Sequence, residues 1–124
     1  MGNEKQKAEP ASFEQPIEEQ VKEQTGQRRI QVVVDEKNLK TSYSNGFLTG
    51  TTAEEVVLDF GFNHVQVSDP AKGEGKIIFH ANERIIMNYY AAKRLAISLG
   101  QIIHRYEQKF GQLELNAAKR QNNQ

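Results

Sequence analysis

The sequence predicts an α+β fold in which an antiparallel β-meander of three to four strands is packed against one long C-terminal α-helix. Three observations support this fold class: a stretch of helical periodicity near the end of the chain, strand-like segments before it, and short turn sequences between those segments. Consecutive strands joined by short turns pair antiparallel, and an apolar helix face requires another element to cover it.

The helix is predicted from Asn88 to Phe110. The Asn88 side chain is suited to accept a free N–H group of the first turn, and Gly111 suits the left-handed position after the last turn. Between them, apolar residues recur at spacings of three and four, which places them on one helix face. We expect the central residues of this face to contact the sheet: Leu95, Leu99, Ile102 and Tyr106.

The strands are expected in order before the helix. Residues 30–36 (IQVVVDE) are rich in β-branched side chains, and residues 41–50 (TSYSNGFLTG) suggest a second strand weakened by Gly46. A tight turn is expected at residues 50–52. The next segment, from EEVVLDFGF onward, alternates between apolar and other residues and leads to a turn at residues 69–75. The last strand is expected at residues 76–87, with a bulge or bend at residues 81–83.

The predicted domain covers residues 30–111. Residues 1–29 are rich in Glu, Gln and Lys and are expected to form a flexible polar arm, and residues 112–124 a polar flexible tail. The chain has no cysteine, its N-terminus lacks the apolar core of a signal peptide, and no apolar run is long enough to span a membrane. We therefore expect a cytoplasmic protein without membrane contact.

Charge is distributed unevenly along a chain whose net charge is zero. Residues 30–75 contain seven acidic and three basic residues, whereas residues 76–124 contain three acidic and eight basic residues. Such asymmetry can orient self-association or steer a partner, and it is also compatible with an ordinary solvated surface.

Several segments together resemble a small prokaryotic family known as domain of unknown function 3467. These segments are YSNGFL, EEVVLDFGF, RIIM, AAKRLAISL and YEQKFG, and the resemblance spans about residues 30–113. Relatives tend to have Thr-Pro where this chain has Asn88-Tyr89, and the hairpin between Phe62 and Lys76 looks longer and more polar here. The resemblance implies a β-meander followed by a helix and a non-enzymatic role, and it implies no established activity.

No pattern of residues predicts a catalytic, cofactor or metal site. His64 and His80 are positioned to face each other across two strands with Asp59 nearby, but a metal site requires three or four converging ligands. Asp59 is expected to be an outward-facing charge that limits strand slippage. We therefore expect a non-catalytic protein that uses no cofactor.

Apolar residues of opposite parity on the last two strands predict self-association. Val57, Ile78 and Ile86 would remain exposed if one helix covered one sheet face, and a small domain buries too little surface to leave them uncovered. We expect a homo-oligomer, most simply a dimer. A second helix seam, away from the main apolar face, is a candidate surface for a second helix or for a partner protein, the alternative being ordinary surface: Tyr90, Lys93, Ile97, Gln101 and His104.

A nucleic-acid-binding module is the alternative function. It would use Arg94, Arg105 and Lys109 on the helix for phosphate contacts, and Tyr43 or Phe47 for base stacking. The neutral net charge and the acidic strands argue against this alternative.

Overall fold

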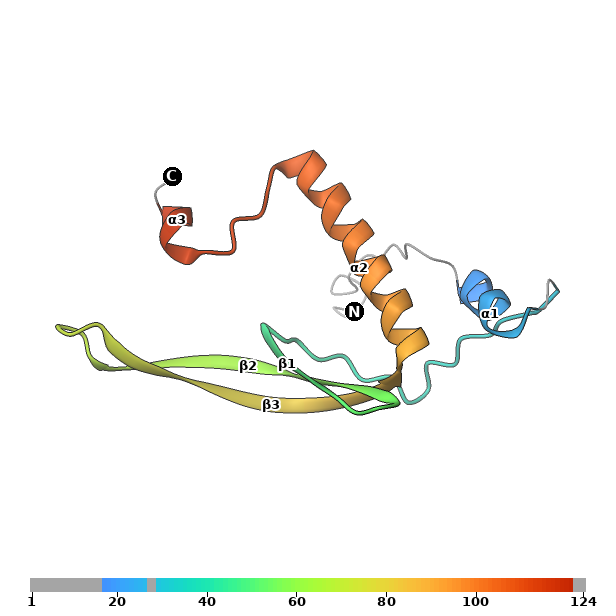
Figure 1. Ribbon diagram of the computed structural model, residues 1–124, viewed down its shortest axis with the longest axis horizontal. Helices are drawn as coiled ribbons and strands as arrows, with labels where there is room; N and C mark the ends of the chain where they lie inside the picture. Colours follow the sequence, from blue (N-terminus) through green and yellow to red (C-terminus); the bar gives the residue numbers. More distant parts are fainter. Residues whose placement is uncertain (1–16, 27–28, 122–124) are drawn as a thin grey trace, which may run out of the picture. The chain divides into compact units, whose positions relative to one another are not determined.

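The computed structural model describes residues 17–26 and 29–121, in which three helices and three strands are defined (Figure 1). One compact unit contains residues 35–96, and a second contains the described residues before position 35 and after position 96. The elements follow in the order α1 (Ile17–Thr25), β1 (Gly46–Thr51), β2 (Glu55–Asp69), β3 (Glu74–Asn88), α2 (Tyr89–Phe110) and α3 (Ala117–Gln121).

The three strands form an antiparallel meander in the order β1-β2-β3, followed by the long helix α2. This confirms the predicted α+β class. Strands β2 and β3 make a long twisted hairpin, and β1 lies beside β2 only at the end from which α2 leaves (Figure 1). The half of the hairpin beyond Gly61 is therefore a two-stranded ribbon in the described structure. An isolated ribbon of this kind is only marginally stable in water.

A β-bulge lies where it was predicted. Phe60 pairs with Glu83 and Gly61 pairs with Ala81, so that Asn82 is the extra residue on β3. Gly61 is buried opposite the bulge, and a Cβ atom at this position would overlap the backbone carbonyl group of His80. The close approach of the two backbones therefore requires a glycine.

The turns agree with the predictions apart from a small shift. The hairpin turn follows Asp69, and Gly73 adopts a positive φ of 68° there. The turn between β1 and β2 lies at residues 52–54, slightly later than the predicted 50–52. It begins at Thr52, whose Oγ1 accepts hydrogen bonds from the N–H groups of Glu54 at 3.3 Å and Glu55 at 3.0 Å. The Thr52 side chain thus determines where the chain reverses.

Residues 30–36 do not form the predicted strand. No residue from 29 to 45 is in a strand, and Val33 and Val34 are 78% and 67% exposed. A turn ends the segment, since the N–H group of Lys37 donates to Asp35 Oδ1 at 3.0 Å. Because β-propensity reflects packing against neighbouring strands, a β-branched run without a partner does not become a strand.

Helix α2 begins and ends as predicted. The N–H group of Ala91 donates to Asn88 Oδ1 at 2.8 Å, which caps the first turn. At the other end Gly111 has a φ of 95°, and its N–H group donates to the carbonyl oxygen of Glu107 at 2.8 Å. The Tyr89 hydroxyl donates to the Thr52 carbonyl oxygen at 2.7 Å and so ties the start of α2 to the β1–β2 turn.

Both terminal segments contain a short helix that the polar composition did not predict. Within the predicted arm, α1 ends at Thr25, and the next residue, Gly26, has a φ of 73° and donates its N–H group to the Lys22 carbonyl oxygen. Within the predicted tail, Asn116 Oδ1 accepts a hydrogen bond from Ala118 at 3.0 Å and caps α3. Local caps thus stabilise helices that have few apolar residues. Residues 1–16, 27–28 and 122–124 of the predicted arm and tail lie outside the described residues.

Among the described residues no hydrophobic side chain is fully buried. Leu95 is half-buried and Leu99, Ile102 and Tyr106 are exposed, and their expected contact with the sheet stays a prediction. The chain passes from Asn88 in β3 to Tyr89 in α2 without a loop.

Candidate interaction surfaces

The main apolar face of α2 is the first uncovered surface. Leu99, Ile102 and Tyr106 are 50%, 40% and 46% exposed, and Phe110 at the end of the helix is 65% exposed. The Tyr106 and Phe110 rings contact each other with centroids 4.9 Å apart. Burying a large apolar side chain contributes about 1.5–3 kcal/mol, so covering this face would stabilise the protein.

The predicted second seam also lies on α2. All five of its residues are exposed: Tyr90, Lys93, Ile97, Gln101 and His104. The exposed fraction is 77% for Tyr90 and 52% for Ile97. At about 100° per residue they share one side of the helix, roughly opposite the main apolar face. Exposed apolar side chains therefore lie on both sides of α2.

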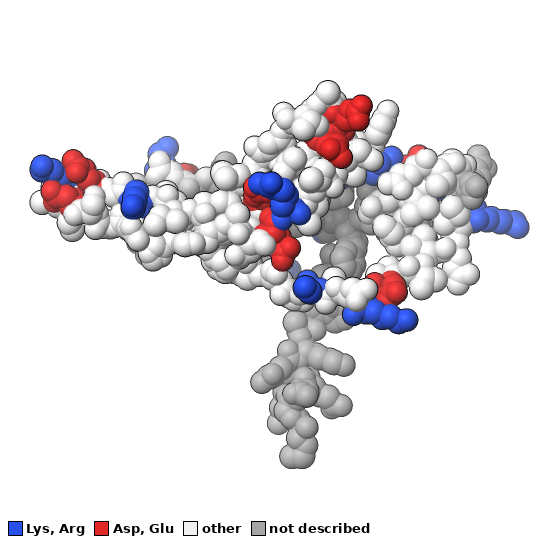
Figure 2. Space-filling view, turned by 90° about the horizontal axis from the view of Figure 1, so that it is seen from below, with Lys and Arg blue, Asp and Glu red and all other residues white. Residues whose placement is uncertain are grey.

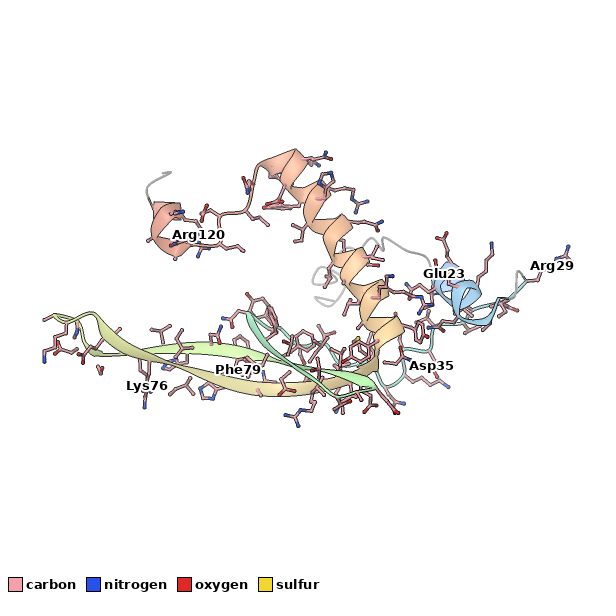
Figure 3. All side chains as sticks on the ribbon, in the orientation of Figure 1. Glu23, Arg29, Asp35, Lys76, Phe79 and Arg120 are labelled. Atoms are coloured by element: carbon pink, nitrogen blue, oxygen red, sulfur yellow. The ribbon has the colours of Figure 1, made fainter. Side chains whose placement is uncertain are left out.

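The distal ribbon, which we define as the part of the hairpin from Phe62 to His80, is the second uncovered surface. Register places Phe79 beside Asn63 and Ile77 beside Val65, and Val67 follows on the same face. Val65, Val67 and Ile77 are 61%, 61% and 65% exposed, and Phe79 is half-buried. Lys76 and Phe79 project from β3 in Figure 3, and Figure 2 shows a mostly uncharged hairpin with charged side chains gathered at its turn.

The opposite face of the distal ribbon is mostly polar. His64, Gln66, Lys76 and His80 lie there, and Phe62 and the half-buried Ile78 are the apolar exceptions. The two imidazole rings lie 6.3 Å apart between centroids. They are diagonal neighbours, since His64 pairs with Ile78 and His80 with Phe62, and Asp59 lies on the other face of the sheet. Among the described residues, no three His, Cys, Asp or Glu side chains gather in a way that could hold a metal ion.

The sheet around the bulge is partly covered by the chain that precedes β1. Tyr43 packs on Phe62 with ring centroids 5.6 Å apart. Ser44 Oγ donates to the Gly61 carbonyl oxygen at 2.9 Å and accepts from the Gly61 N–H group at 3.0 Å. Asn45 Oδ1 accepts from the Asn63 N–H group at 2.9 Å. These contacts fix the segment beside the bulge, and a shallow groove separates it from Phe60, Glu83 and Ile85.

Sequence reasoning did not assign these anchoring roles to Ser44 and Asn45. A signal in the sequence was the Ser-Asn-Gly run at residues 44–46, because Ser and Asn side chains readily form hydrogen bonds to backbone groups.

The candidate nucleic-acid residues also lie on α2. Arg94 is half-buried, whereas Arg105 and Lys109 are exposed. The Lys109 ammonium group lies 5.4 Å from the centre of the Phe110 ring, which is within the range of a cation–π contact. Tyr43 packs on Phe62, so one of the two predicted stacking aromatics already has a partner ring. Phe47 remains 67% exposed.

A bidentate ion pair joins β2 and β3. Arg84 Nε donates to Asp59 Oδ1 at 2.7 Å, and Arg84 Nη2 donates to Asp59 Oδ2 at 2.9 Å. The pairing fits the predicted role of Asp59 as a charge that limits slippage, because a shift of one residue would place the partners on opposite faces. Hydrogen bonding from Arg84 lowers the pKa of the Asp59 carboxyl below its ordinary value, although partial desolvation opposes this change.

The lowered pKa predicts a pH dependence. Asp59 releases its proton more readily in the folded chain, so the ion pair stabilises the fold above the ordinary carboxyl pKa of about 4. This stabilisation is lost as the pH falls through the folded-state pKa. In an NMR titration, Arg84→Met is expected to raise the pKa of Asp59 toward its ordinary value, whereas Lys72→Met at the hairpin turn should leave it unchanged. An unchanged titration in Arg84→Met would contradict the assignment.

A family model described as "Protein of unknown function (DUF3467)" matches residues 2–115. The chain belongs to the DUF3467 family. No curated protein and no solved structure matches the chain. No described helix of this DUF3467 member is long and apolar enough to cross a membrane.

Three of the segments that carried the family resemblance meet one another in the structure: YSNGFL, EEVVLDFGF and RIIM. Ser44 and Asn45 of YSNGFL bond to the backbone of β2 at Gly61 and Asn63. Asp59 of EEVVLDFGF pairs with Arg84 of RIIM. These motif residues of the DUF3467 member therefore hold the strands in register, which is a structural role.

Proposed function

We propose that this DUF3467 protein is a non-catalytic module that functions as a homodimer. The observation that carries the proposal is the absence of any buried hydrophobic side chain in the described part of the chain. Folding of a domain depends mainly on apolar burial, which must offset conformational entropy of similar size. A second copy provides the missing burial.

The proposed interface combines the main apolar face of α2 with apolar strand residues. Leu99, Ile102 and Tyr106 lie on the helix, and Val65 and Ile77 lie on the strands. Obligate dimer interfaces are more hydrophobic than other protein interfaces and resemble a domain core divided between two chains. The second seam around Ile97 remains outside this interface and is available to a partner protein.

Dimerisation coupled to folding makes stability depend on concentration. We expect the midpoint of thermal unfolding, followed by circular dichroism, to rise steadily as protein concentration increases a hundredfold, because mass action favours the folded dimer. A midpoint that stays constant over this range, with a cooperative transition, would show that the single chain is stable alone and would overturn the proposal.

Nucleic-acid binding is the second candidate, and the charge of α2 favours it. The helix has four basic residues, namely Lys93, Arg94, Arg105 and Lys109, and one acidic residue, Glu107. Retention on a heparin column that disappears at moderate salt would support this candidate. Because the net charge of the chain is zero, we expect little retention. A triple variant, Arg94→Gln, Arg105→Gln and Lys109→Gln, tests whether any retention depends on these residues.

A further inference from the structure

The outer edge of β3 has backbone groups available for a further strand. In the sheet order β1-β2-β3, β3 has a neighbouring strand on one side only, and the described residues form no fourth strand (Figure 1). The N–H group of Asn63 bonds to Asn45 on the β1 side, so its partner on β3, Phe79, directs its own N–H and C=O groups away from β2. By the same alternation, Ile77 and Ala81 also direct their backbone groups outward.

The part of this edge before the bulge has few of the features that prevent strand pairing. Proteins commonly protect an edge strand with proline, with charged side chains or with a bulge. Residues 75–81 (GKIIFHA) contain no proline and, among Lys, Arg, Asp and Glu, only Lys76. The bulge residue Asn82 comes after this segment. An edge segment with this composition readily accepts an added strand, whose backbone hydrogen bonds provide affinity.

A second β3 strand fits this edge about a two-fold axis at Phe79. In an antiparallel pair, residues whose N–H and C=O groups point toward each other lie opposite one another. With the axis at this position, Phe79 faces Phe79 of the second copy, and Ile77 faces Ala81 once on each side of the axis. Aromatic and β-branched side chains are favourable cross-strand neighbours, so this register stabilises the pairing.

Charge complementarity favours the same register. Because Asn82 is the extra residue of the bulge, the pairing omits it and places Glu83 opposite Lys76 of the second copy. Both side chains lie on the face of the sheet that carries the even-numbered residues of β2. Two-fold symmetry forms this pair of opposite charges twice. An axis one residue earlier, at Ile78, would instead place Glu83 opposite Glu74, which is unfavourable.

We propose that the homodimer forms through antiparallel pairing of the two β3 edges about Phe79, which joins two three-stranded sheets into one sheet. This inference rests on the proposed self-association and specifies how the strands take part in it. The second copy is the occupant because the edge is complementary to itself, both in backbone hydrogen bonds and in charge. The pairing also gives the distal ribbon a third neighbouring strand, which stabilises a hairpin that is marginal as two strands alone.

Cross-linking through a single cysteine tests the pairing, because the chain contains no cysteine. Phe79→Cys places two thiols at facing positions, where Cα atoms lie about 5.5 Å apart. Val65→Cys is the matched control on the same ribbon face, but on β2, where three strand spacings of about 4.8 Å separate the two copies. With a short bismaleimide and full-length protein at low micromolar concentration, we expect about a fivefold or higher yield of covalent dimer for Phe79→Cys, because only its thiols lie within reach.

Charge reversal tests the register and leaves Phe79 in place. Lys76→Glu is expected to raise the dissociation constant of the dimer about tenfold at low salt, because it places like charges opposite each other at two positions. Glu83→Lys should weaken the dimer similarly, and both reversals in one chain should restore the constant of the unmodified protein. Glu54→Lys, at the β1–β2 turn, makes the same change of net charge away from the β3 edge and should have little effect. Sedimentation equilibrium measures these constants.

The outcomes separate strand pairing from self-association itself. Equal yields of covalent dimer with Phe79→Cys and Val65→Cys, together with a dimer mass by light scattering, would overturn the pairing and leave the homodimer in place. If Lys76→Glu combined with Glu83→Lys weakens the dimer more than either change alone, the register is wrong and the proposal fails with it. A monomer mass for the unmodified protein would overturn both the pairing and the homodimer.

Discussion

Ile102→Asp is expected to dissociate the dimer. Ile102 lies at the centre of the main apolar face of α2 and is 40% exposed in the single chain, so the proposed interface would bury it. An unpaired carboxylate at such a position loses its hydration without gaining a partner, which is strongly unfavourable. Sedimentation velocity should show a shift from dimer to monomer or to unfolded chain over the concentration range in which the unmodified protein remains dimeric.

Ile97→Asp is the matched control. It makes the same replacement on the same helix at a residue that is 52% exposed, but on the second seam. The dimer mass and the thermal unfolding midpoint should change little in this variant. The opposite result, a dimer in Ile102→Asp and a monomer in Ile97→Asp, would assign the interface to the seam formed by Tyr90, Ile97 and His104 instead.

Among substitutions of a sheet glycine by alanine, Gly61→Ala is expected to cause the largest loss of stability. The added Cβ would overlap the His80 carbonyl group, and the backbone there cannot move without disturbing the bulge and the Ser44 hydrogen bonds. We expect the free energy of unfolding to fall by about 2 kcal/mol or more, as for other substitutions that create strain at a tightly packed position. Urea denaturation at a fixed protein concentration measures this change.

Gly50→Ala provides the comparison within the same sheet. A Cβ at Gly50 would meet its nearest atom, Val57 Cβ, at an ordinary contact distance of 3.9 Å. Alanine is tolerated at such a site, and it reduces the conformational entropy of the unfolded chain. The stability of Gly50→Ala should therefore stay within about 0.5 kcal/mol of the unmodified protein. A similar loss in both variants would contradict the role assigned to Gly61.

Local signals predicted the features that depend on one or two residues. Asn88 and Gly111 marked the ends of α2 because capping is a local property of the chain. The interruption of the apolar pattern at residues 81–83 predicted the bulge around Asn82 because an extra residue shifts the side-chain alternation.

Features that depend on distant partners were not predictable in this way. The β-branched residues 30–36 have strand propensity, yet the described sheet contains no strand beside them. The apolar periodicity of α2 identifies the side chains that gain stability from burial, but it does not determine whether the same chain or another copy covers them. Val57, Ile78 and Ile86 were expected on one uncovered sheet face, which is wrong: the bulge at Asn82 shifts the alternation, so Val57 and Ile86 pair on one face and Ile78 lies beside His64 on the other. Ile86 is 55% exposed, whereas Val57 and Ile78 are half-buried.

The mass of the protein in dilute solution tests the central claim most directly. The chain has a mass of 14.1 kDa. Multi-angle light scattering of the full chain at micromolar concentration, after size-exclusion chromatography, should give twice this value, with a folded circular dichroism spectrum in the same fractions. A folded species with the mass of one chain would contradict the proposal, because it would show that the single chain is stable with its apolar surfaces uncovered.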